Sequence, residues 1–282
     1  MTMLFSTLTI VGVGLIGGSV GLAAKKRGIA RRVLGVGCDL HQLEQARRLG
    51  AIDVGTLDLA DAARTADFII FCAPVDHIAG QIKDAAAHCK TGSILTDAGS
   101  TKQEIVKAVE TDLPGHVLFV GGHPLAGSEK KGVDNGHADL FVQRWTVLTP
   151  TQKTPKGALA SVQSFWQALG SRVRIMAPAD HDQALALTSH LPHLLASVLA
   201  GVLPDDWVEL TASGFRDMTR VASGDPCLWL PIFQHNRQAV LGALDQLEDR
   251  LREVRQALAN HDVSRINQYL AQGKKVRDAL GS

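Results

Sequence analysis

The first half of the chain alternates short apolar runs with amphipathic segments. The apolar runs, each bounded by turn residues, lie at residues 8–13, 32–37, 67–74, 92–99 and 116–122. Such short and continuously apolar runs are typical of strands that are covered on both faces. Helical patterns lie between several of them, at residues 17–27, 41–49 and 101–110. This alternation predicts a parallel sheet with right-handed crossovers.

Two further candidate strands, 145–150 and 172–177, lie on either side of a helical segment at 156–169. After Pro178 the pattern changes, and residues 181–202, 237–261 and 266–280 all read as helices. Within the second of these, apolar residues recur every three or four positions, at Val240, Leu241, Leu244, Leu247, Leu251, Val254 and Leu258. This stripe is too apolar to face water along its whole length, so we expect a homodimer.

The charge balance argues against two classes of partner. Lys and Arg number 29 and Asp and Glu number 28, so we expect neither nucleic-acid nor membrane binding. Residues 1–24 carry no charge, but five glycines interrupt them and no basic segment precedes them, so we do not expect a targeting or membrane segment. The four cysteines are far apart and form no CxxC pair, which indicates a reducing compartment, the cytoplasm, and no metal site.

A glycine fingerprint follows the first apolar run directly. Gly12, Gly14 and Gly17, with Leu15 and Ile16 between them, form GxGxxG at the junction of a predicted strand and helix. The first glycine allows a tight turn, the second a close approach to a pyrophosphate, and the third close helix packing. The alternative is a glycine-rich hinge that binds nothing. We favour a Rossmann-type α/β dinucleotide-binding domain over residues 1–177, followed by an all-helical substrate and dimerisation domain over 178–282.

The choice of cofactor depends on the end of the second strand. Asp39 is the nearest acid to the position about 20 residues beyond the glycines. It could accept a hydrogen bond from a ribose 2′-hydroxyl and repel a 2′-phosphate. Residues 37–42 contain no Lys or Arg that would bind that phosphate. We therefore favour NAD, and NADP is not excluded.

Three polar stretches carry the candidate chemistry: DAGSTK at 97–102, GGHPLAGSE at 121–129, and FRDMTR at 215–220. The first two follow predicted strands, so they meet at the edge where open α/β sheets bind ligands. His123 sits between a glycine pair and a proline, and we expect it in a rigid turn. A neutral imidazole suits general-base work near pH 7, and the alternative is a histidine that caps a loop.

Together with GVGLIGGS at 12–19, SHLPH at 189–193 and DPCLW at 225–229, these stretches resemble the prephenate/arogenate dehydrogenases of tyrosine biosynthesis. The family combines a Rossmann domain with a helical dimerisation domain. The resemblance implies oxidative decarboxylation of prephenate to 4-hydroxyphenylpyruvate, with hydride transfer to NAD. It assigns His123 as the residue that accepts the hydroxyl proton, with Ser100 bonded to the imidazole or to that hydroxyl.

The resemblance also assigns the substrate side of the site. Arg220 would bind a carboxylate of the dicarboxylate substrate, and His190 would be a second substrate residue. Ser128 or Glu129 would line the entrance, and Asp217 would position Arg220. The competing interpretation makes Arg216, Asp217 and Arg220 a solvated helix face.

Other residues with chemical side chains are given structural roles or none. His193 is expected to be packed in an apolar helix, and Trp229 to be core or a pocket wall. No role is assigned to His77, His88 or His181.

Three alternatives remain open. Arogenate differs from prephenate only in an amino group for a keto group, and no residue decides between them; tyrosine feedback is also undecided. A β-hydroxyacid or 6-phosphogluconate-type dehydrogenase would need a lysine in the long helix, and residues 181–202 contain none. A non-catalytic dinucleotide sensor would need neither Ser100 and His123 nor Arg220.

Overall fold

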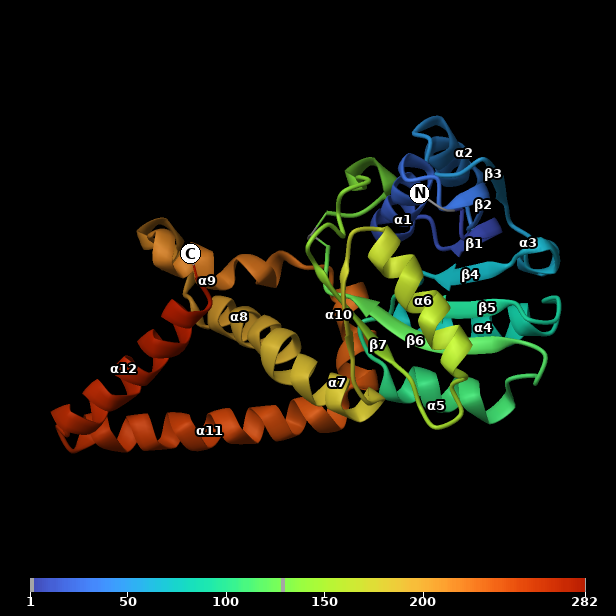
Figure 1. Ribbon diagram of the computed structural model, residues 1–282. Coiled ribbons are helices and arrows are strands. Elements are labelled where there is room, and N and C mark those ends of the chain that lie inside the picture. Colours follow the sequence, from blue (N-terminus) through green and yellow to red (C-terminus); the bar gives the residue numbers. More distant parts are fainter. Residues whose placement is uncertain (1–2, 128–129, 282) are drawn as a thin grey trace. The chain divides into compact units, whose positions relative to one another are not determined.

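The computed structural model describes residues 3–127 and 130–281, and the chain divides into two compact units, Met1–Asn236 and Arg237–Ser282. In the part of the chain that is described, the first unit contains one eight-stranded sheet of order β3-β2-β1-β4-β5-β6-β7-β8 (Figure 1). The strands are β1 (Phe5–Val11), β2 (Ala30–Val36), β3 (Val54–Thr56), β4 (Phe68–Phe71), β5 (Ile94–Asp97), β6 (Leu118–Pro124), β7 (Trp145–Thr149) and β8 (Arg172–Ile175).

The sheet is parallel except at one position. β6 and β7 pair antiparallel, with Gly121 opposite Thr149 and His123 opposite Val147. All the other neighbouring strands run parallel, as predicted. The reversal follows from the connection between β6 and β7. Its described residues form a 3₁₀ turn, η1 (Val133–Asn135), and no α-helix that would carry the chain back along the sheet.

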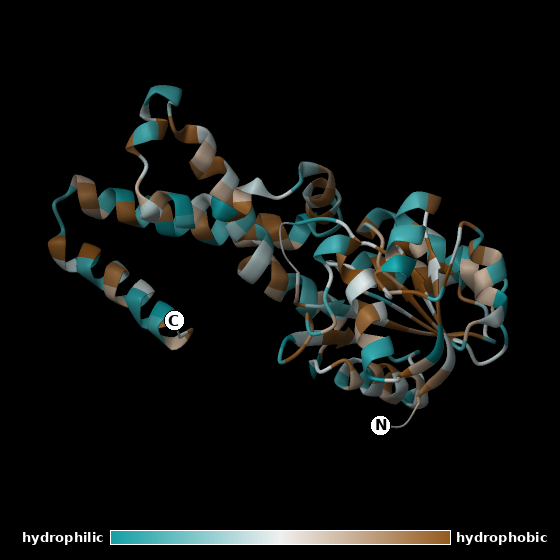
Figure 2. Ribbon diagram, turned by 90° about the horizontal axis from the view of Figure 1, so that it is seen from above, coloured by the Kyte–Doolittle hydropathy of each residue, from teal (hydrophilic) through white to brown (hydrophobic). Residues whose placement is uncertain are grey.

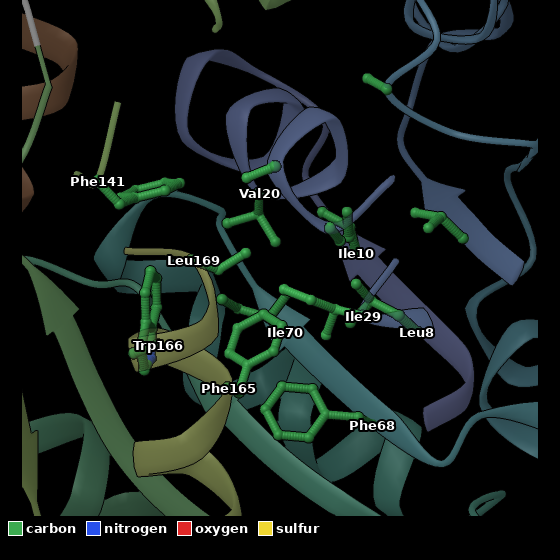
Figure 3. Close-up of a cluster of buried hydrophobic side chains, with 14 of the residues drawn as sticks. Leu8, Ile10, Val20, Ile29, Phe68, Ile70, Phe141, Phe165, Trp166 and Leu169 are labelled. Atoms are coloured by element: carbon green, nitrogen blue, oxygen red, sulfur yellow. The ribbon is translucent and has the colours of Figure 1, made fainter. Parts of the chain in front are cut away.

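The two faces of the sheet are covered by different helices. Leu8, Ile10, Phe68 and Ile70 point to one face, where they pack with α1 (Leu15–Lys26) and α6 (Lys156–Ala168). Figure 3 shows this cluster, with Phe165 of α6 beside Phe68 and Ile70 and Trp166 toward Phe141. The alternate strand residues point to the other face, under α3 (Leu59–Thr65), α4 (Val75–Ala86) and α5 (Gln103–Asp112). α2 (Leu40–Arg48) follows β2.

The predicted strands and helices lie where the hydrophobic pattern put them, with shifts of a few residues at the ends. The predicted ranges left out β3, α3 and α4 in the first half of the chain and the short helices between residues 203 and 236. The uncharged N-terminal stretch supplies β1 and most of α1. In Figure 2 much of the sheet is brown, in line with the apolar runs that predicted its central strands.

Residues 178–202 form one helical stretch that is interrupted by a π turn. α7 (Pro178–Leu185) continues through η2 (Ala186–His190) into α8 (Leu191–Val202). Among the described residues it is the one stretch long and apolar enough to cross a membrane by length and composition, and 33% of that window is buried. A single such helix is weak grounds for a membrane span, because core helices of globular proteins pass the same test.

Shorter helices complete the first unit: η3 (Asp205–Leu210), α9 (Ser213–Thr219), η4 (Arg220–Ser223) and α10 (Pro226–His235). The second unit consists of α11 (Arg237–Ala259) and α12 (Val263–Ala279). Within it, the hydroxyl of Tyr269 donates to Glu253 at 2.7 Å. The chain changes from strands and helices to helices alone near residue 177, whereas the boundary between the two compact units lies after Asn236.

Candidate active site

The glycine fingerprint forms the tight turn between β1 and α1. Gly12 has a φ of +89°, and a Cβ there would lie 2.9 Å from the backbone of Cys72, the residue that follows β4. A Cβ on Gly17 would lie 2.1 Å from the carbonyl oxygen of Gly12, so α1 can pack on the turn only with glycine there. A Cβ on Gly14 would meet nothing within 4 Å. The backbone at Gly14 is therefore open to a ligand at the N-terminus of α1.

A cleft of about 480 Å³ lies beside this turn. Gly14, Leu15 and Ile16 line one part of it, and the described lining also includes residues 72–75 after β4 and 98–100 after β5. Backbone N–H groups at a helix N-terminus suit a phosphate, and α1 has no acid in its first turn to repel one. The site therefore fits a dinucleotide.

Asp39 lies just beyond β2, at the position expected of the residue that selects the ribose. Its side chain accepts a hydrogen bond from the backbone N–H of His41 at 2.8 Å and caps α2. The side chain is exposed, so its second oxygen faces solvent at the strand edge. Asp39 is not among the described residues that line the cleft.

Beyond β5 lies a fully buried ion pair. Asp97, the last residue of β5, contacts the ammonium of Lys102, and both side chains have no exposed surface. The other oxygen of Asp97 accepts from the backbone N–H of Gly122 on β6 at 3.0 Å. A Cβ on Gly122 would lie 2.8 Å from the carbonyl oxygen of Asp97, so this approach requires glycine. Burial lowers the pKa of Lys102, and Asp97 opposes that shift.

His123 lies in β6, and the expected turn is wrong. The GGHP segment continues the strand to Pro124 because β7 pairs with it along its length. Its Nδ1 lies 2.8 Å from Nε2 of His181 on α7, and the two rings meet at 66°. His181, which was given no role from the sequence, is therefore the partner of the candidate base.

His181 is anchored in turn by its neighbour, Asp182. The Nδ1 atom of His181 lies 2.7 Å from a carboxylate oxygen of Asp182, and His181 has no exposed surface. The Asp182 carboxylate also accepts from the backbone N–H groups of Lys102 at 2.8 Å and Gln103 at 2.9 Å. Asp182 thus ties α7 to the N-terminus of α5.

Burial controls the charge of these histidines. His123 is 9% exposed, and burial, aided by His181, Lys102 and His190, holds its pKa well below the usual value of 6.5. Burial also lowers the pKa of His181, although Asp182 opposes the shift. Both rings are therefore neutral at pH 7, which is the state a proton acceptor requires.

A second cavity, of about 640 Å³, opens beside His123. Its described lining includes Ser100, His190 and Arg220, which come from three separate parts of the sequence. Ser100 and Leu228 line this cavity and the glycine-turn cleft alike, so the two spaces share a wall. Lys131 and Asp225, which form an ion pair, also line both.

His190 ends the π turn, with its ring against the cavity. Its Nδ1 lies 3.0 Å from the amide nitrogen of Asn236, which also donates to the carbonyl oxygen of Asp182 at 2.8 Å. The other ring nitrogen, Nε2, is buried and has no hydrogen-bond partner among the described residues. Burial lowers the pKa of His190 to about 4, so this ring is neutral as well.

His193 and Trp229 combine the packed role expected of them with a place at the cavity. Their rings stack at 3.6 Å between centroids and 12° between planes. Both residues line the cavity. The stack forms part of an aromatic wall that also includes Phe233.

The remaining predicted residues differ in whether they lie at the cavity. Arg220 lines the cavity at the start of η4, whereas Asp217 is exposed on α9 and is not among the described lining residues. Ser128 and Glu129 lie outside the described residues. In the described chain the Nδ1 atom of His123 bonds to His181, and no hydrogen bond joins the Ser100 hydroxyl to His123. The bond of Ser100 to the substrate hydroxyl stays a prediction.

The sequence analysis missed His181, Asp182, Lys102 and Asn236. Lys102 belongs to the DAGSTK stretch, where a lysine directly before a helix gives no sign of burial. His181 and Asp182 are neighbours in an ordinary helical segment. His181 lies 58 residues from His123 in the sequence. In the described residues, no group of three or more His, Cys, Asp or Glu side chains is placed to hold a metal ion.

Comparison with known proteins places this geometry in a family. The model of the prephenate dehydrogenase nucleotide-binding domain matches residues 20–175, and that of the prephenate dehydrogenase dimerization domain matches residues 177–272. The cyclohexadienyl dehydrogenase of Zymomonas mobilis is 35% identical over 283 residues, which cover 98% of this chain and 96% of that protein.

Solved structures agree over nearly the whole chain. The prephenate dehydrogenase of Aquifex aeolicus in complex with hydroxyphenyl propionate and NAD⁺ is 31% identical, with a TM-score of 0.93 and 99% of each chain covered. The arogenate dehydrogenase of Synechocystis is also 31% identical, with a TM-score of 0.84 and coverage of 97% and 99%. With both domain models matched in order and the site assembled between β6 and α7–α8, this chain belongs to the prephenate dehydrogenase family.

Proposed function

We propose that this chain is an NAD-dependent prephenate dehydrogenase and that its two adjoining cavities bind the cofactor and the substrate. The reaction converts prephenate and NAD⁺ into 4-hydroxyphenylpyruvate, CO₂ and NADH. The observation that carries the proposal is the position of His123, a buried and neutral imidazole at a cavity that shares a wall with the dinucleotide cleft. The bound nicotinamide supplies the acceptor for the hydride.

The chain's own residues handle the proton. As hydride leaves the ring carbon that bears the hydroxyl, that hydroxyl becomes a carbonyl, and its proton passes to the imidazole of His123. The carbon–carbon bond to the ring carboxylate then breaks, and its electron pair makes the ring aromatic. The proton returns from His123 to the phenolate oxygen, so the overall reaction needs no other proton source. Ser100, on the wall between the cavities, is placed to bind the same hydroxyl.

The charges around the cavity favour a dianion. The described lining contains three cationic residues, Lys130, Lys131 and Arg220, and one carboxylate, Asp225, which is paired with Lys131. Prephenate carries two carboxylates, and we assign Arg220 to one of them because a guanidinium can bind a carboxylate through two hydrogen bonds. His190 offers a further polar contact.

Arogenate is the second candidate substrate. The similarity to the arogenate dehydrogenase of Synechocystis favours it, at 31% identity and a TM-score of 0.84. Its ammonium group, however, is best met by a carboxylate, and the carboxylate in the described lining, Asp225, is already paired with Lys131. We therefore place prephenate first. Asp39, as an acid at the end of β2, favours NAD over NADP.

We propose a homodimer in the cytoplasm. The matched domain model over residues 177–272 is that of a dimerization domain. Large apolar side chains are exposed on α8, including Val198 and Val202, and on α11 and α12, including Leu251 and Leu270. A partner subunit would cover such faces. All four cysteines are free thiols, which suits a reducing compartment. We also propose that residues 1–177 hold the cofactor and that 178–282 supply substrate contacts and the dimer interface.

Initial rates with two substrates and two cofactors test the function. Prephenate and arogenate would each be mixed with NAD and with NADP, and formation of the reduced nicotinamide would be followed by absorbance. We expect the highest kcat/KM with prephenate and NAD. A higher kcat/KM with arogenate would mean that arogenate, and not prephenate, is the substrate. A lack of turnover in all four mixtures, with NAD still bound, would favour the non-catalytic sensor.

A further inference from the structure

We propose that Asp182 fixes the protons of both histidines that face the substrate cavity, so that His123 presents an acceptor and His190 a donor. Two chains of hydrogen bonds start at Asp182, one at its carboxylate and one at its backbone carbonyl. The first leaves Nε2 of His123 without a proton, and the second leaves Nε2 of His190 with one. Asp182 is thus a positioning residue for the reaction. The inference rests on the proposed function for its catalytic meaning, but the proton positions themselves can be tested without it.

The first chain starts at the carboxylate of Asp182. An ionised carboxylate can only accept, so the Nδ1 atom of His181, 2.7 Å away, must carry its proton. In a neutral ring the Nε2 atom of His181 is then an acceptor. The Nδ1 atom of His123, at 2.8 Å, must therefore donate to it. This leaves Nε2 of His123 without a proton and ready to accept one from a substrate hydroxyl.

The second chain starts at the backbone carbonyl of Asp182. A carbonyl oxygen only accepts, so the atom of Asn236 at 2.8 Å is its NH₂ group, and the amide orientation is settled. The same NH₂ group lies 3.0 Å from Nδ1 of His190 and donates to it. The proton of the neutral His190 ring is therefore on Nε2. That atom is buried and lacks a partner among the described residues, so it offers a donor to a ligand.

The two rings therefore make opposite demands on the substrate. An oxygen that changes from hydroxyl to carbonyl must first give up a proton and then accept hydrogen bonds. His123 meets the first need, and a neutral donor such as His190 meets the second without adding a charge. Other charged or titratable groups around His123 are Asp97 on β5, Lys102 before α5, and His181 with Asp182 on α7. None of them provides a second acceptor for the Nδ1 proton of His123 among the described contacts.

The proton positions can be observed directly by nitrogen-15 NMR of the histidine rings, because protonated and unprotonated ring nitrogens differ widely in chemical shift. His123→Asn and His190→Asn spectra assign the signals. We expect wild-type His123 protonated on Nδ1 and His190 protonated on Nε2. A His123 ring protonated on Nε2 in the wild-type protein at pH 7 would overturn the proposal.

Asp182→Ala tests the cause, because it removes the acceptor altogether. Without the carboxylate nothing holds the proton of His181 on Nδ1, so Nε2 of His181 can carry it and His123 then carries its own proton on Nε2. The matched control is Asp180→Ala, at an exposed acid in the first turn of the same helix. We expect the His123 signals to show the form protonated on Nε2 in Asp182→Ala and to stay unchanged in the control. Unchanged His123 signals in both variants would refute the role of Asp182.

Kinetics give the second readout. In Asp182→Ala we expect kcat to fall in proportion to the share of His123 that carries its proton on Nε2, with little change in NAD binding. The residual rate should rise in proportion to hydroxide, because hydroxide would then remove the proton. A purely structural defect would instead lower the folded fraction and leave the shape of the pH profile unchanged.

Asp182 also caps α5, so a variant that spares this contact is needed. His181→Gln retains an amide that can donate to Asp182 and accept from His123, whereas His181→Leu can do neither. We expect the glutamine variant to keep a larger share of kcat than the leucine variant, at equal circular dichroism and NAD affinity. Equal losses in the two would count against the relay. If wild-type protein turned over no substrate, the proposed function would fall, and NMR would still decide the proton positions.

Discussion

The ammonium of Lys102 contacts the carboxylate of Asp97 where neither side chain has any exposed surface. Removing one partner of such a pair leaves an uncompensated buried charge, which typically costs about 3–5 kcal/mol. We expect Lys102→Met to lower the free energy of unfolding by about that amount in urea titrations. The double variant with Asp97→Asn should recover part of it, because no charge is then left alone. A single variant as stable as wild type would show that water reaches the pair.

His123→Asn should separate cofactor binding from chemistry. His123 touches the substrate cavity and is not among the described residues that line the glycine-turn cleft, so NAD affinity should change little. Turnover should fall by something on the order of 10²–10⁴-fold. Calorimetry of NAD binding and steady-state rates measure the two effects. Wild-type turnover in the variant would eliminate His123 from the mechanism.

The pH dependence of kcat/KM should show where His123 becomes charged. Burial and the neighbouring Lys102, His181 and His190 lower its pKa, so the ring stays neutral through pH 6.5. The rate should therefore hold constant as pH falls through 6.5 and decline only well below that value. An acid limb centred at 6.5 or above would mean that the titrating group is another residue or that water enters the site.

Stability should also fall in acid, with the sign set by the same buried rings. The pKa values of His123, His181, His190 and His193 are all lowered by burial in the folded chain. Below about pH 6.5 the unfolded chain thus binds more protons than the folded chain, and the free energy of unfolding decreases as pH falls. His190 contributes between pH 6.5 and about 4. Urea midpoints across that window measure the effect, and a midpoint that rose toward pH 4 would contradict it.

Arg220→Ala should raise the KM for prephenate by roughly ten- to a hundredfold, because a charge-assisted hydrogen bond is worth about 1.5–3 kcal/mol. Arg220→Lys should restore only part of the affinity. Arg216, four residues earlier and exposed on α9, gives the matched control, since it is not among the described lining residues. Equal effects of the two alanine variants would favour the solvated-face interpretation.

The dimer can be tested by light scattering at micromolar concentration, where we expect twice the 30.1 kDa chain mass. Leu251 on α11 is 56% exposed and belongs to the predicted apolar stripe. Leu251→Glu should weaken association, whereas Arg255→Glu, one turn later on the same helix, should weaken it less. A wild-type protein that remained at 30.1 kDa would contradict the homodimer.

Much of the fold could be predicted because it depends on local pattern. β4 is a continuous apolar run, β1 ends in one, and α11 follows a regular stripe. The antiparallel pairing of β6 and β7 could not be predicted in this way, because the direction of β7 depends on how a long irregular connection folds. His123 was consequently expected in a turn, although β7 holds it in a strand.

The candidate site divides along similar lines. Gly12, Gly14 and Gly17 could be proposed from their local spacing, and His123 and Arg220 from the stretches that contain them. The contact of His123 with His181 spans 58 residues, and that of Asn236 with Asp182 spans 54. Hydrogen bonds between such distant positions leave no periodic signal in a single sequence. His181 and Asp182 also lie in a short helix, PADHDQAL, whose other polar residues gave no sign that these two are buried.

The π turn between α7 and α8 has a consequence for how these residues share one site. In a uniform α-helix each residue turns by about 100°, so His181 and His190, nine positions apart, would face opposite sides. A π turn accommodates one extra residue, and this brings the two side chains to within about a quarter-turn of each other around the helix axis. Asp182 can then serve both rings through its carboxylate and its carbonyl. The pairing of an acceptor and a donor in this cavity thus depends on the π turn. The same residues in a regular α-helix would not provide that pairing.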